Sequence, residues 1–366
     1  MKIRALIIIT VFSAVLFSSC SREDIPVPVE ESAYVKKMRL LDWGVDTCFV
    51  YGHKTPDVDA VTSALSYANL MRTLGYNCKA KVSSPMNRET SYIAGVFGFD
   101  LPELKENVVP QTRLILTDHT DYAQCVDGAK EAIILQKIDH HTEGDIKDAN
   151  ISYVRREMVG STNTIIYKIY KEEGLPIDDN TARIMLAGII SDTRNLTKST
   201  TKGIDQTALN DLALQLCISS DSVAILNRNM EEAIYDYSGM TDEEIFLSDY
   251  KDYDINGYTV GFGCVACKDT EMDAFFDHML AVMPEIMQER DRQMLFLKID
   301  KRVKNTGEDS RLNPYLRDGF YLVYFGEGTK EVAESIFGES VRENACYASD
   351  DMSRKQIIPL ITDLLQ

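Results

Sequence analysis

Histidine and aspartate residues stand together in three short blocks of the sequence. The blocks are His53-x-x-x-Asp57-x-Asp59, Asp118-His119 and Asp139-His140-His141. The chain has only five histidines, and four of them fall in these blocks. Imidazole and carboxylate groups together form the mixed nitrogen and oxygen ligand sets that suit Mn²⁺, Co²⁺ or Zn²⁺. A single histidine is more often structural than a ligand, but this repeated pairing with aspartate indicates a metal centre.

Each block directly follows a segment that is predicted to be a strand. The apolar runs that predict strands are Thr47–Tyr51, Arg113–Thr117 and Ala132–Ile138. Helical periodicity is found over Ala60–Leu74, Thr162–Glu173 and Ala182–Ile190, and the last of these runs into Asp192. Strands that alternate with helices predict an α/β fold with a parallel sheet flanked by helices. Because ligands bind at the carboxyl ends of such strands, we expect the three blocks and Asp192 to meet there.

A second, smaller α/β domain is expected after the turn at Tyr237-Ser238-Gly239-Met240. Its predicted strands are Tyr258–Ala266, Met294–Ile299 and Gly319–Phe325, with helices between them. The polar stretch from Lys301 to Asp318 is expected to be a long surface loop. We place the first domain over residues 41–236 and the second over residues 242–366, since a chain of 366 residues can form two separate cores.

The first residues of the chain have the composition of a bacterial export signal. Lys2 and Arg4 precede an apolar run, Ala5–Phe17, that is too short to span a bilayer comfortably as a mature helix. Small residues before Cys20 are typical of a lipoprotein cleavage site, so we expect residues 1–19 to be removed and Cys20 to be lipidated. Residues 20–40 are then expected to be an acidic tether. This predicts an exported protein, anchored by lipid to a bacterial membrane on its periplasmic or cell-surface side; an uncleaved signal anchor is the alternative.

The net charge of −18 disfavours nonspecific binding to nucleic acid or anionic lipid, because both are polyanions. Small anionic substrates remain compatible with this charge where cations or metal ions are locally concentrated. Cys264 and Cys267 form a C-x-x-C pair, but no second pair of cysteines or histidines stands nearby to complete a zinc site. We therefore expect buried thiols or an incidental disulfide at these two positions.

Several longer motifs resemble a known enzyme superfamily. The segments GHKTPDVDA (Gly52–Ala60), LTDHTDYAQ (Leu116–Gln124), IDHH (Ile138–His141), VGSTNTIIYKIYKEEGLPI (Val159–Ile177) and IISDTRNLTKST (Ile189–Thr200) resemble the DHH phosphoesterases. The segment SRKQIIPLITD (Ser353–Asp363) is similar to the C-terminal signature of the manganese-dependent, family II inorganic pyrophosphatases. The resemblance implies a DHH domain and a C-terminal domain with a mixed sheet, with the active site in the cleft between them.

The resemblance also implies roles for individual residues. His53 and Asp57 would hold one metal ion, Asp59, His140 and Asp192 would hold the other, and Asp118 would bridge the two. His141 would face the substrate phosphate, with Asp139 orienting an imidazole from behind. The phosphate-binding cations of the second domain would be Lys251, Arg354 and Lys355. The implied cofactors are two Mn²⁺ ions, with Co²⁺ as a substitute, and Mg²⁺ that arrives with the substrate.

Metal-dependent hydrolysis of a phosphoanhydride follows from the resemblance, most directly hydrolysis of inorganic pyrophosphate to two phosphates by a hydroxide shared between the metals. One alternative is a short-chain polyphosphatase or nucleotide phosphohydrolase with the same metal core. Another is a non-catalytic lipoprotein that binds phosphate compounds or metal. The sequence departs from the family pattern in or near the second domain, at Glu231-Glu232, at the C-x-x-C pair and in the insertion-like stretch 301–318. Because this domain is expected to determine the size of the substrate, these departures affect the prediction of the substrate more than that of the reaction. Whether the chain forms a homodimer is left open.

Overall fold

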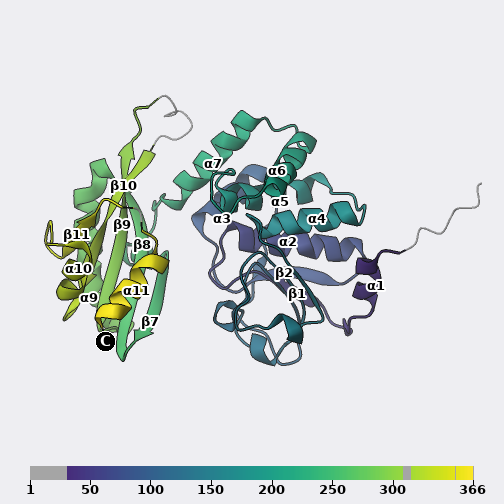
Figure 1. The fold of residues 1–366 in the computed structure, drawn as a ribbon, viewed down its shortest axis with the longest axis horizontal. Coiled ribbons are helices and arrows are strands. Elements are labelled where there is room, and N and C mark those ends of the chain that lie inside the picture. Colours follow the sequence, from purple (N-terminus) through teal and green to yellow (C-terminus); the bar gives the residue numbers. More distant parts are fainter. Residues whose placement is uncertain (1–30, 308–314, 351, 366) are drawn as a thin grey trace, which may run out of the picture.

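The computed structural model describes residues 31–307, 315–350 and 352–365, which form two α/β domains side by side (Figure 1). The predicted signal segment, residues 1–19, and Cys20 lie outside the described residues. Among the described residues, no single helix has the length and apolar composition to cross a membrane. One pair of helices bent by 107°, Gly203–Gln215 and Ser220–Ile234, meets those two criteria only when taken together.

The first domain is built on a six-stranded sheet in the order β3-β2-β1-β4-β5-β6. All five pairs of neighbouring strands are parallel, which confirms the predicted parallel sheet. The three predicted strands are β1, β4 and β5, and the strands that the sequence patterns did not predict are β2, β3 and β6. Their bounds are β1 Cys48–Tyr51, β2 Cys78–Val82, β3 Glu103–Leu104, β4 Arg113–Thr117, β5 Ile133–Asp139 and β6 Tyr153–Arg156.

Helices cover one face of this sheet, and their apolar side chains form the main core of the domain. They are α2 Val58–Thr73, α3 Arg88–Phe97, α4 Thr162–Glu172, α5 Asp179–Thr193, α6 Gly203–Gln215 and α7 Ser220–Ile234. A smaller apolar cluster on the other face includes Leu114, Leu116 and Val126, and is closed by the short 3₁₀ segments η1 Tyr122–Gln124 and η2 Ala129–Glu131. A third 3₁₀ segment, η3 Asp148–Asn150, precedes β6.

Gly52 allows the first strand to run tightly into the first long helix. A Cβ atom at this position would lie 2.3 Å from the carbonyl oxygen of Ala60, one turn into α2. The backbone oxygen cannot move away without disturbing the helix, so a side chain here would separate β1 from α2. The glycine therefore brings His53, at the end of β1, close to the amino end of α2.

The acidic tether predicted for residues 20–40 is wrong at its C-terminal end. Residues Ala33–Arg39 form helix α1, capped by the Ser32 side chain. Tyr34 and Met38 are buried in the main core of the first domain, and the Tyr34 hydroxyl lies 3.0 Å from that of Tyr67 on α2. These apolar side chains stand one helical turn apart, and that short periodicity was obscured by the surrounding polar residues.

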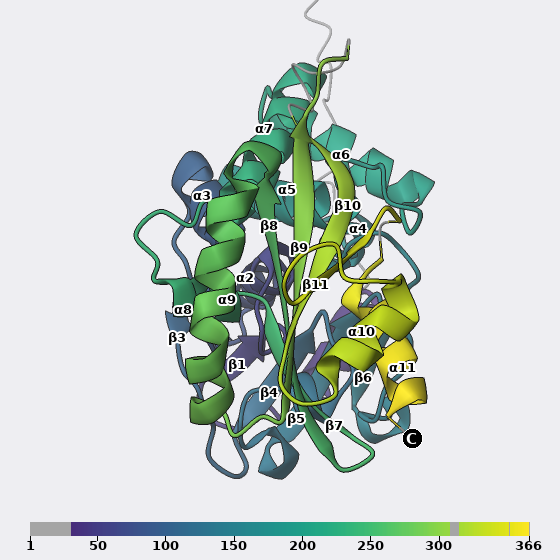
Figure 2. The same cartoon turned by 90° about the vertical axis from the view of Figure 1, so that its left-hand side faces the viewer.

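The second domain contains a mixed five-stranded sheet in the order β11-β10-β9-β8-β7. Only β8 and β9 are parallel, which agrees with the expected mixed sheet. Helices α8 and α9 pack on one face, and α10 and α11 on the other (Figure 2). The bounds are α8 Asp242–Leu247, β7 Tyr250–Ile255, β8 Tyr258–Lys268, η4 Asp269–Glu271, α9 Met272–Glu289, β9 Met294–Lys304, β10 Tyr315–Phe325, α10 Thr329–Phe337, β11 Ala345–Ala348 and α11 Arg354–Leu364.

The long loop predicted from Lys301 to Asp318 is wrong at both of its ends. Strand β9 continues to Lys304 and β10 begins at Tyr315, and the two pair as far as Lys304 opposite Tyr315. A register shift between Arg317 and Phe320 lets the polar ends of the strands continue the ladder beyond the core. The mostly polar composition of these ends does not prevent them from forming strands, because cross-strand hydrogen bonds stabilise their backbone.

The two cysteines of the C-x-x-C pair are free thiols on β8. Residues three positions apart on a strand point to opposite faces of the sheet. Accordingly, Cys267 belongs to the core on the α9 side and Cys264 packs against the core on the α11 side. This geometry supports the interpretation as separate thiols, one buried (Cys267) and one partly buried (Cys264), and removes the alternative of a disulfide between them.

Candidate metal centre

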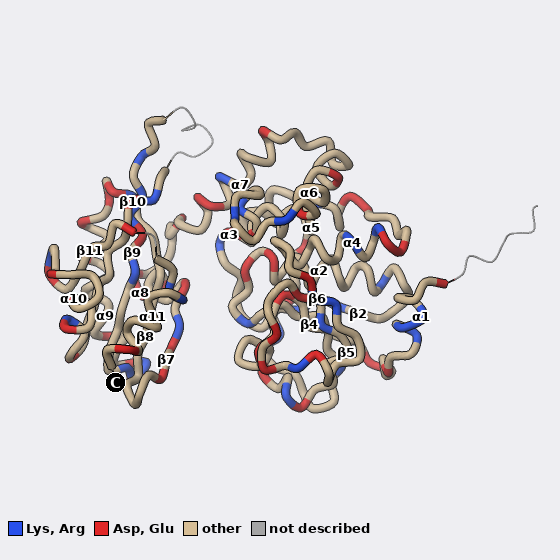
Figure 3. Tube along the Cα trace, in the orientation of Figure 1, with Lys and Arg blue, Asp and Glu red and all other residues tan. Residues whose placement is uncertain are grey.

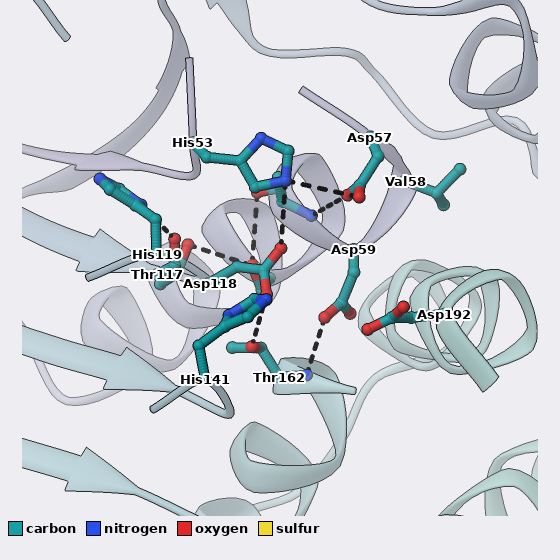
Figure 4. A network of polar contacts seen from close by, with 12 residues as sticks. His53, Asp57, Val58, Asp59, Thr117, Asp118, His119, His141, Thr162 and Asp192 are labelled. Carbon is teal, nitrogen blue, oxygen red and sulfur yellow. Dashed lines mark hydrogen bonds and ion pairs between the residues drawn. The ribbon is translucent and has the colours of Figure 1, made fainter. Parts of the chain in front are cut away.

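Seven histidine and aspartate side chains converge at the carboxyl end of the first sheet (Figure 4). Three groups of potential ligands have donor atoms within 4.8 Å of one another: His53 with Asp57 and Asp118; Asp59 with His140 and Asp192; and Asp118 with His140 and His141. They come from the ends of β1, β4 and β5, the start of α2 and the end of α5. The structure thus brings together every residue that was predicted to bind metal.

Asp118 lies at the centre of this arrangement and is almost fully buried. One carboxylate oxygen is 3.3 Å from His140 Nε2, and the other is 3.6 Å from His53 Nε2. The backbone of Asp118 has φ +58°, a left-handed conformation that aspartate tolerates better than most residues. This conformation follows directly after β4 and turns the carboxylate toward both histidines. Asp118 therefore contacts a histidine of each predicted ligand set, His53 of the first and His140 of the second.

Asp57 combines a structural role with a position in the first ligand set. It is the N-cap of α2, and its Oδ1 accepts a hydrogen bond of 2.9 Å from the backbone N–H of Ala60. Its Oδ2 lies 3.4 Å from His53 Nε2. Burial alone lowers the pKa of His53, but the carboxylates of Asp57 and Asp118 outweigh it and raise that pKa to about 9.

Asp59 is held at the amino end of helix α4. Its carboxylate accepts hydrogen bonds from Ser161 Oγ at 2.6 Å, from the backbone N–H of Thr162 at 2.8 Å and from Asn163 Nδ2 at 2.8 Å. Gly188 of α5 makes room for this network, because a Cβ atom there would lie 2.2 Å from Asn163 Nδ2 and 2.9 Å from Asp59 Oδ1. The positive end of the α4 dipole faces the carboxylate, which favours its ionised form.

His140 and Asp192 complete the second ligand set. The Nδ1 atom of His140 lies 3.0 Å from the carbonyl oxygen of Val159, so it donates there and leaves Nε2 free to bind an ion. That Nε2 atom is 3.3 Å from Asp192 Oδ2. Burial disfavours a charged imidazole, but hydrogen bonding and charge from Asp118, with further charge from Asp59, raise the pKa of His140 to about 11.

His141 is oriented by Asp139, as the sequence predicted for that carboxylate. The His141 Nδ1 atom lies 2.9 Å from Asp139 Oδ1, and the His141 backbone N–H donates to Asp139 Oδ2 at 3.1 Å. The side chain of Asp139 is fully buried, whereas that of His141 is 48% exposed. The buried carboxylate thus fixes an imidazole whose other nitrogen is available at the surface of the site.

His119 does not join the cluster, although it belongs to one of the three sequence blocks. Its Nδ1 lies 2.9 Å from the carbonyl oxygen of Thr117, and its Nε2 lies 3.2 Å from Cys125 Sγ. Burial lowers its pKa to about 4, so the imidazole is neutral at physiological pH. It follows Asp118 immediately, and the turn that directs Asp118 inward directs His119 to the opposite side of the sheet.

The donor atoms fit a pair of divalent cations. Four of the gathered side chains are carboxylates, Asp57, Asp59, Asp118 and Asp192, with a formal charge of −4 that two divalent ions (+4) would balance. Burial raises the pKa of Asp59 well above its usual value, and the negative charges of Asp118 and Asp192 raise it further. Such crowding of buried carboxylates is unfavourable without cations and becomes favourable with them.

Three cations of the second domain gather beside β7 and the start of α11. Lys251 on β7 pairs with Phe262 on β8, and the carbonyl oxygen of Phe262 accepts a hydrogen bond from Arg354 at 3.3 Å. Burial and the charges of Arg354 and Lys355 lower the pKa of Lys251. Lys251 also lowers the pKa of His53, so its charge reaches the first ligand set across the two domains. Figure 3 shows acidic residues on the side of the first domain that faces the second. Arg354 is not free in this arrangement, because it donates to the carbonyl oxygen of Asp249 at 2.8 Å and forms an ion pair with the Asp249 carboxylate.

Some residues of the site were not assigned roles from the sequence. Thr162 Oγ1 donates to Asp118 Oδ1 at 2.9 Å, Ser161 and Asn163 bind Asp59, and Lys198 Nζ lies 2.6 Å from Asp192 Oδ1. All of them lie within the motif segments 159–177 and 189–200. The motifs were therefore the available signal, but they carry no information about which hydroxyl or amine faces which carboxylate.

Two protein-family models match the chain. The model described as "DHH family, N-terminal domain" matches residues 47–189, and the "DHHA2 domain" model matches residues 228–364. A protein of Clostridium acetobutylicum named "Probable manganese-dependent inorganic pyrophosphatase" is 31% identical over 323 residues, which cover 88% of this chain and 99% of that protein. The manganese-dependent inorganic pyrophosphatase of Methanothrix thermoacetophila is 30% identical over 318 residues, covering 86% of this chain and 97% of that protein.

A solved structure agrees with these sequence relatives. The crystal structure of a Methanococcus jannaschii protein assigned to the family II inorganic pyrophosphatases superimposes with a TM-score of 0.66 at 26% sequence identity. The superposition covers 86% of this chain and 98% of the other, so both domains are shared. The chain therefore belongs to the manganese-dependent, family II inorganic pyrophosphatases, which combine a DHH domain with a DHHA2 domain.

Proposed function

We propose that the protein hydrolyses inorganic pyrophosphate to two phosphates in a reaction that depends on divalent metal. One observation carries the proposal: Asp118 lies between His53 of one ligand set and His140 of the other, at the sheet edge where all the predicted metal ligands meet. A dinuclear site that faces a group of cations is suited to a small substrate with several negative charges. Membership of the pyrophosphatase family supports the same substrate.

The first ion would be held by His53 and Asp57, the second by Asp59, His140 and Asp192, with Asp118 between them. Mn²⁺ fits this mixture of imidazole and carboxylate donors, and Co²⁺ would be accepted by the same set. When bound, such a pair of ions lowers the pKa of a water molecule and screens the charge on the phosphate oxygens. The chain's own hydrogen bonds hold the ligands in place before any ion binds: Thr162 Oγ1 donates to Asp118, and His140 Nδ1 donates to the carbonyl oxygen of Val159.

The phosphate groups would be bound by His141, Lys251, Arg354 and Lys355. Asp139 holds His141 with its Nδ1 occupied, so the exposed Nε2 can donate to a phosphate oxygen when the ring is protonated. Arg354 and Lys355 stand in the first turn of α11, where backbone N–H groups also favour an anion. Arg354 would exchange its ion pair with Asp249 for a phosphate, since a guanidinium binds phosphate in a bidentate manner. A Mg²⁺ ion carried by the substrate would reduce the remaining negative charge.

Substrate binding would draw the two domains together, because the metal ligands and the cations belong to different domains. Closure would exclude water and strengthen each ionic interaction in the site. The linker between α7 and α8 is short, and the Arg88 guanidinium of the first domain donates to the carbonyl oxygen of Ser238 within it at 2.9 Å. The two domains would therefore move about this linker, which the hydrogen bond from Arg88 holds against the first domain.

The proposal is tested with purified protein assayed against several metals and substrates. Mn²⁺, Co²⁺, Mg²⁺ and Zn²⁺ are each combined with pyrophosphate, tripolyphosphate and a short oligonucleotide, and phosphate or nucleotide release is measured. Pyrophosphate in Mn²⁺ should give the highest kcat/KM. Preference for tripolyphosphate or for the oligonucleotide would replace the proposed substrate, and binding without turnover would make the protein a non-catalytic phosphate or metal carrier.

We further propose that the protein is exported and held at a membrane by lipid on Cys20. The motivation is the sequence of residues 1–20. An exported enzyme would release phosphate from phosphoanhydrides outside the cytoplasm, and its acidic surface makes nucleic acid an unfavourable partner. Cys20→Ser should release the protein from the membrane fraction, and globomycin should block its processing. A native protein that is unprocessed and remains in the soluble fraction would contradict this location.

A further inference from the structure

Lys198 contacts one of the candidate metal ligands directly. Its Nζ atom lies 2.6 Å from Asp192 Oδ1, while Asp192 Oδ2 lies 3.3 Å from His140 Nε2. The two carboxylate oxygens are therefore divided between two partners. One faces the second ligand set and the other is held by the lysine. The Asp192 side chain is 19% exposed and that of Lys198 is 36% exposed, so the pair lies at the rim of the site.

A strained stretch of backbone returns the lysine to the aspartate. Three consecutive residues after α5 have left-handed backbone conformations, with φ of 46° at Arg194, 49° at Asn195 and 68° at Leu196. None of them is glycine, so each is disfavoured by its own Cβ. The turn is closed by the Leu196 N–H, which donates to Thr193 Oγ1 at 3.0 Å, and by the Lys198 N–H, which donates to the Thr193 carbonyl oxygen at 3.0 Å.

Among the ligands of the second set, Asp192 is the one that Lys198 contacts in the described residues. Burial raises the pKa of Asp192, and Lys198 is the group that most strongly opposes this rise. Neither Asp59 nor His140 is contacted by a lysine or arginine in the hydrogen bonds and ion pairs of the described residues. Lys198 is thus placed to control the orientation of one carboxylate without occupying the space between the ligands.

We propose that Lys198 is a positioning residue that holds Asp192 with a single oxygen directed toward the second metal ion. This inference rests on the proposed two-ion site, and it assigns Lys198 to that site's second ligand set. Groups that orient metal ligands in this way commonly change metal affinity by about 10- to 100-fold. Lys198 also repels a bound cation electrostatically. Its removal would therefore weaken metal binding by releasing Asp192 and strengthen metal binding by removing this repulsion. The strained turn that places Lys198 favours orientation as the dominant effect.

The test is titration of metal-free protein with Mn²⁺, followed by the electron paramagnetic resonance signal of free Mn²⁺. The wild type should bind two ions. Lys198→Met should weaken one binding event by about 10- to 100-fold and leave the other unchanged. Lys198→Arg, which keeps a donor and a charge, should recover most of the lost affinity. Lys202→Met, at an exposed lysine on the same segment, is the matched control and should bind as the wild type does.

Each outcome decides a separate point. Equal or tighter binding of both ions by Lys198→Met would overturn the inference, because repulsion would then be the larger effect. Weakening of both events together with a lower melting temperature of the metal-free protein would also overturn it, since the lysine would then act through folding. A wild type that binds fewer than two ions would refute the proposed two-ion site itself, and this is seen before any variant is compared.

Discussion

Replacement of Asp118 by asparagine tests the role of the shared ligand. Asparagine has nearly the same shape, and its side-chain oxygen can still accept the hydrogen bond from Thr162 Oγ1, which is 2.9 Å long in the wild type. The change therefore removes one negative charge and one potential ligand oxygen with little effect on packing. Asp118 is buried between His53 and His140, so the lost charge is one that both histidines face directly.

The size of the effect follows from the distances. The Asp118 oxygens lie 3.3 and 3.6 Å from the histidine nitrogens of the two ligand sets. A pair of unit charges about 4 Å apart interacts by about 4 kcal/mol at an effective dielectric constant of about 20. A loss of this size in the transition state corresponds to about a thousandfold decrease in kcat/KM. Both ions would be affected, so metal affinity should fall as well.

The assay is pyrophosphate hydrolysis in saturating Mn²⁺, with metal content measured on the same samples. Asp127→Asn is the matched control, because the Asp127 side chain is 67% exposed and pairs with Lys54 at the surface. The control should keep wild-type activity and metal content. Activity of Asp118→Asn within about tenfold of the wild type, with two ions bound, would show that Asp118 does not bridge the ions.

Three further predictions concern protons, substrate and the domain connection. The pKa values of His53 and His140 are raised to about 9 and about 11 in the metal-free protein, so both imidazoles carry a proton at pH 7.5. Mn²⁺ binding at this pH should therefore release about two protons to the buffer, and the affinity for Mn²⁺ should increase as the pH rises toward 9. A calorimetric binding enthalpy that does not depend on the buffer would contradict this. Lys355→Ala should raise KM and lower kcat while two ions remain bound, and loss of metal instead would show that Lys355 supports the first domain. Arg302 of the second domain forms a 2.8 Å ion pair with Glu232 of the first domain and lies 4.3 Å from the centre of the Tyr235 ring. Arg302→Gln removes both contacts, so it should lower the free energy of unfolding by about 2 kcal/mol and increase the radius of gyration measured by X-ray scattering. If neither quantity changes, Arg302 does not link the domains.

The position of the metal centre could be predicted because it depends on a general property of parallel sheets. Polar blocks after β1, β4 and β5 must meet when these strands run side by side in one direction. This meeting of the blocks requires only the strand assignment, which the apolar runs indicated. The sequence pattern began the helix after β1 at Ala60, so it did not predict that Asp57 caps α2 or that Asp59 lies in its first turn.

Side-chain direction at the strand ends could not be predicted in the same way. Asp118 and His119 are adjacent, yet a left-handed residue sends one into the ligand cluster and the other toward Cys125. The three left-handed residues that precede Lys198 are equally hidden, because none of them is glycine. Local backbone conformations of this kind depend on individual hydrogen bonds, such as those from the Asp118 N–H to the Ile138 carbonyl oxygen and from the Leu196 N–H to Thr193 Oγ1. Such bonds leave no pattern in the sequence.

Short and polar elements were the other source of error. Helix α1 has only seven residues, and its two buried side chains are too few to establish a period. The β9–β10 hairpin extends beyond the core, so its outer residues are polar although they are paired. In both cases contacts with another segment, rather than local composition, determine the structure.

The central claim is that the cluster around Asp118 holds two divalent cations, and anomalous diffraction from Mn²⁺-soaked crystals tests it most directly. We predict two anomalous peaks per chain, one among His53, Asp57 and Asp118 and the other among Asp59, His140 and Asp192, with Asp118 contacting both. A single peak, or peaks away from these side chains, in crystals of active protein would contradict the account.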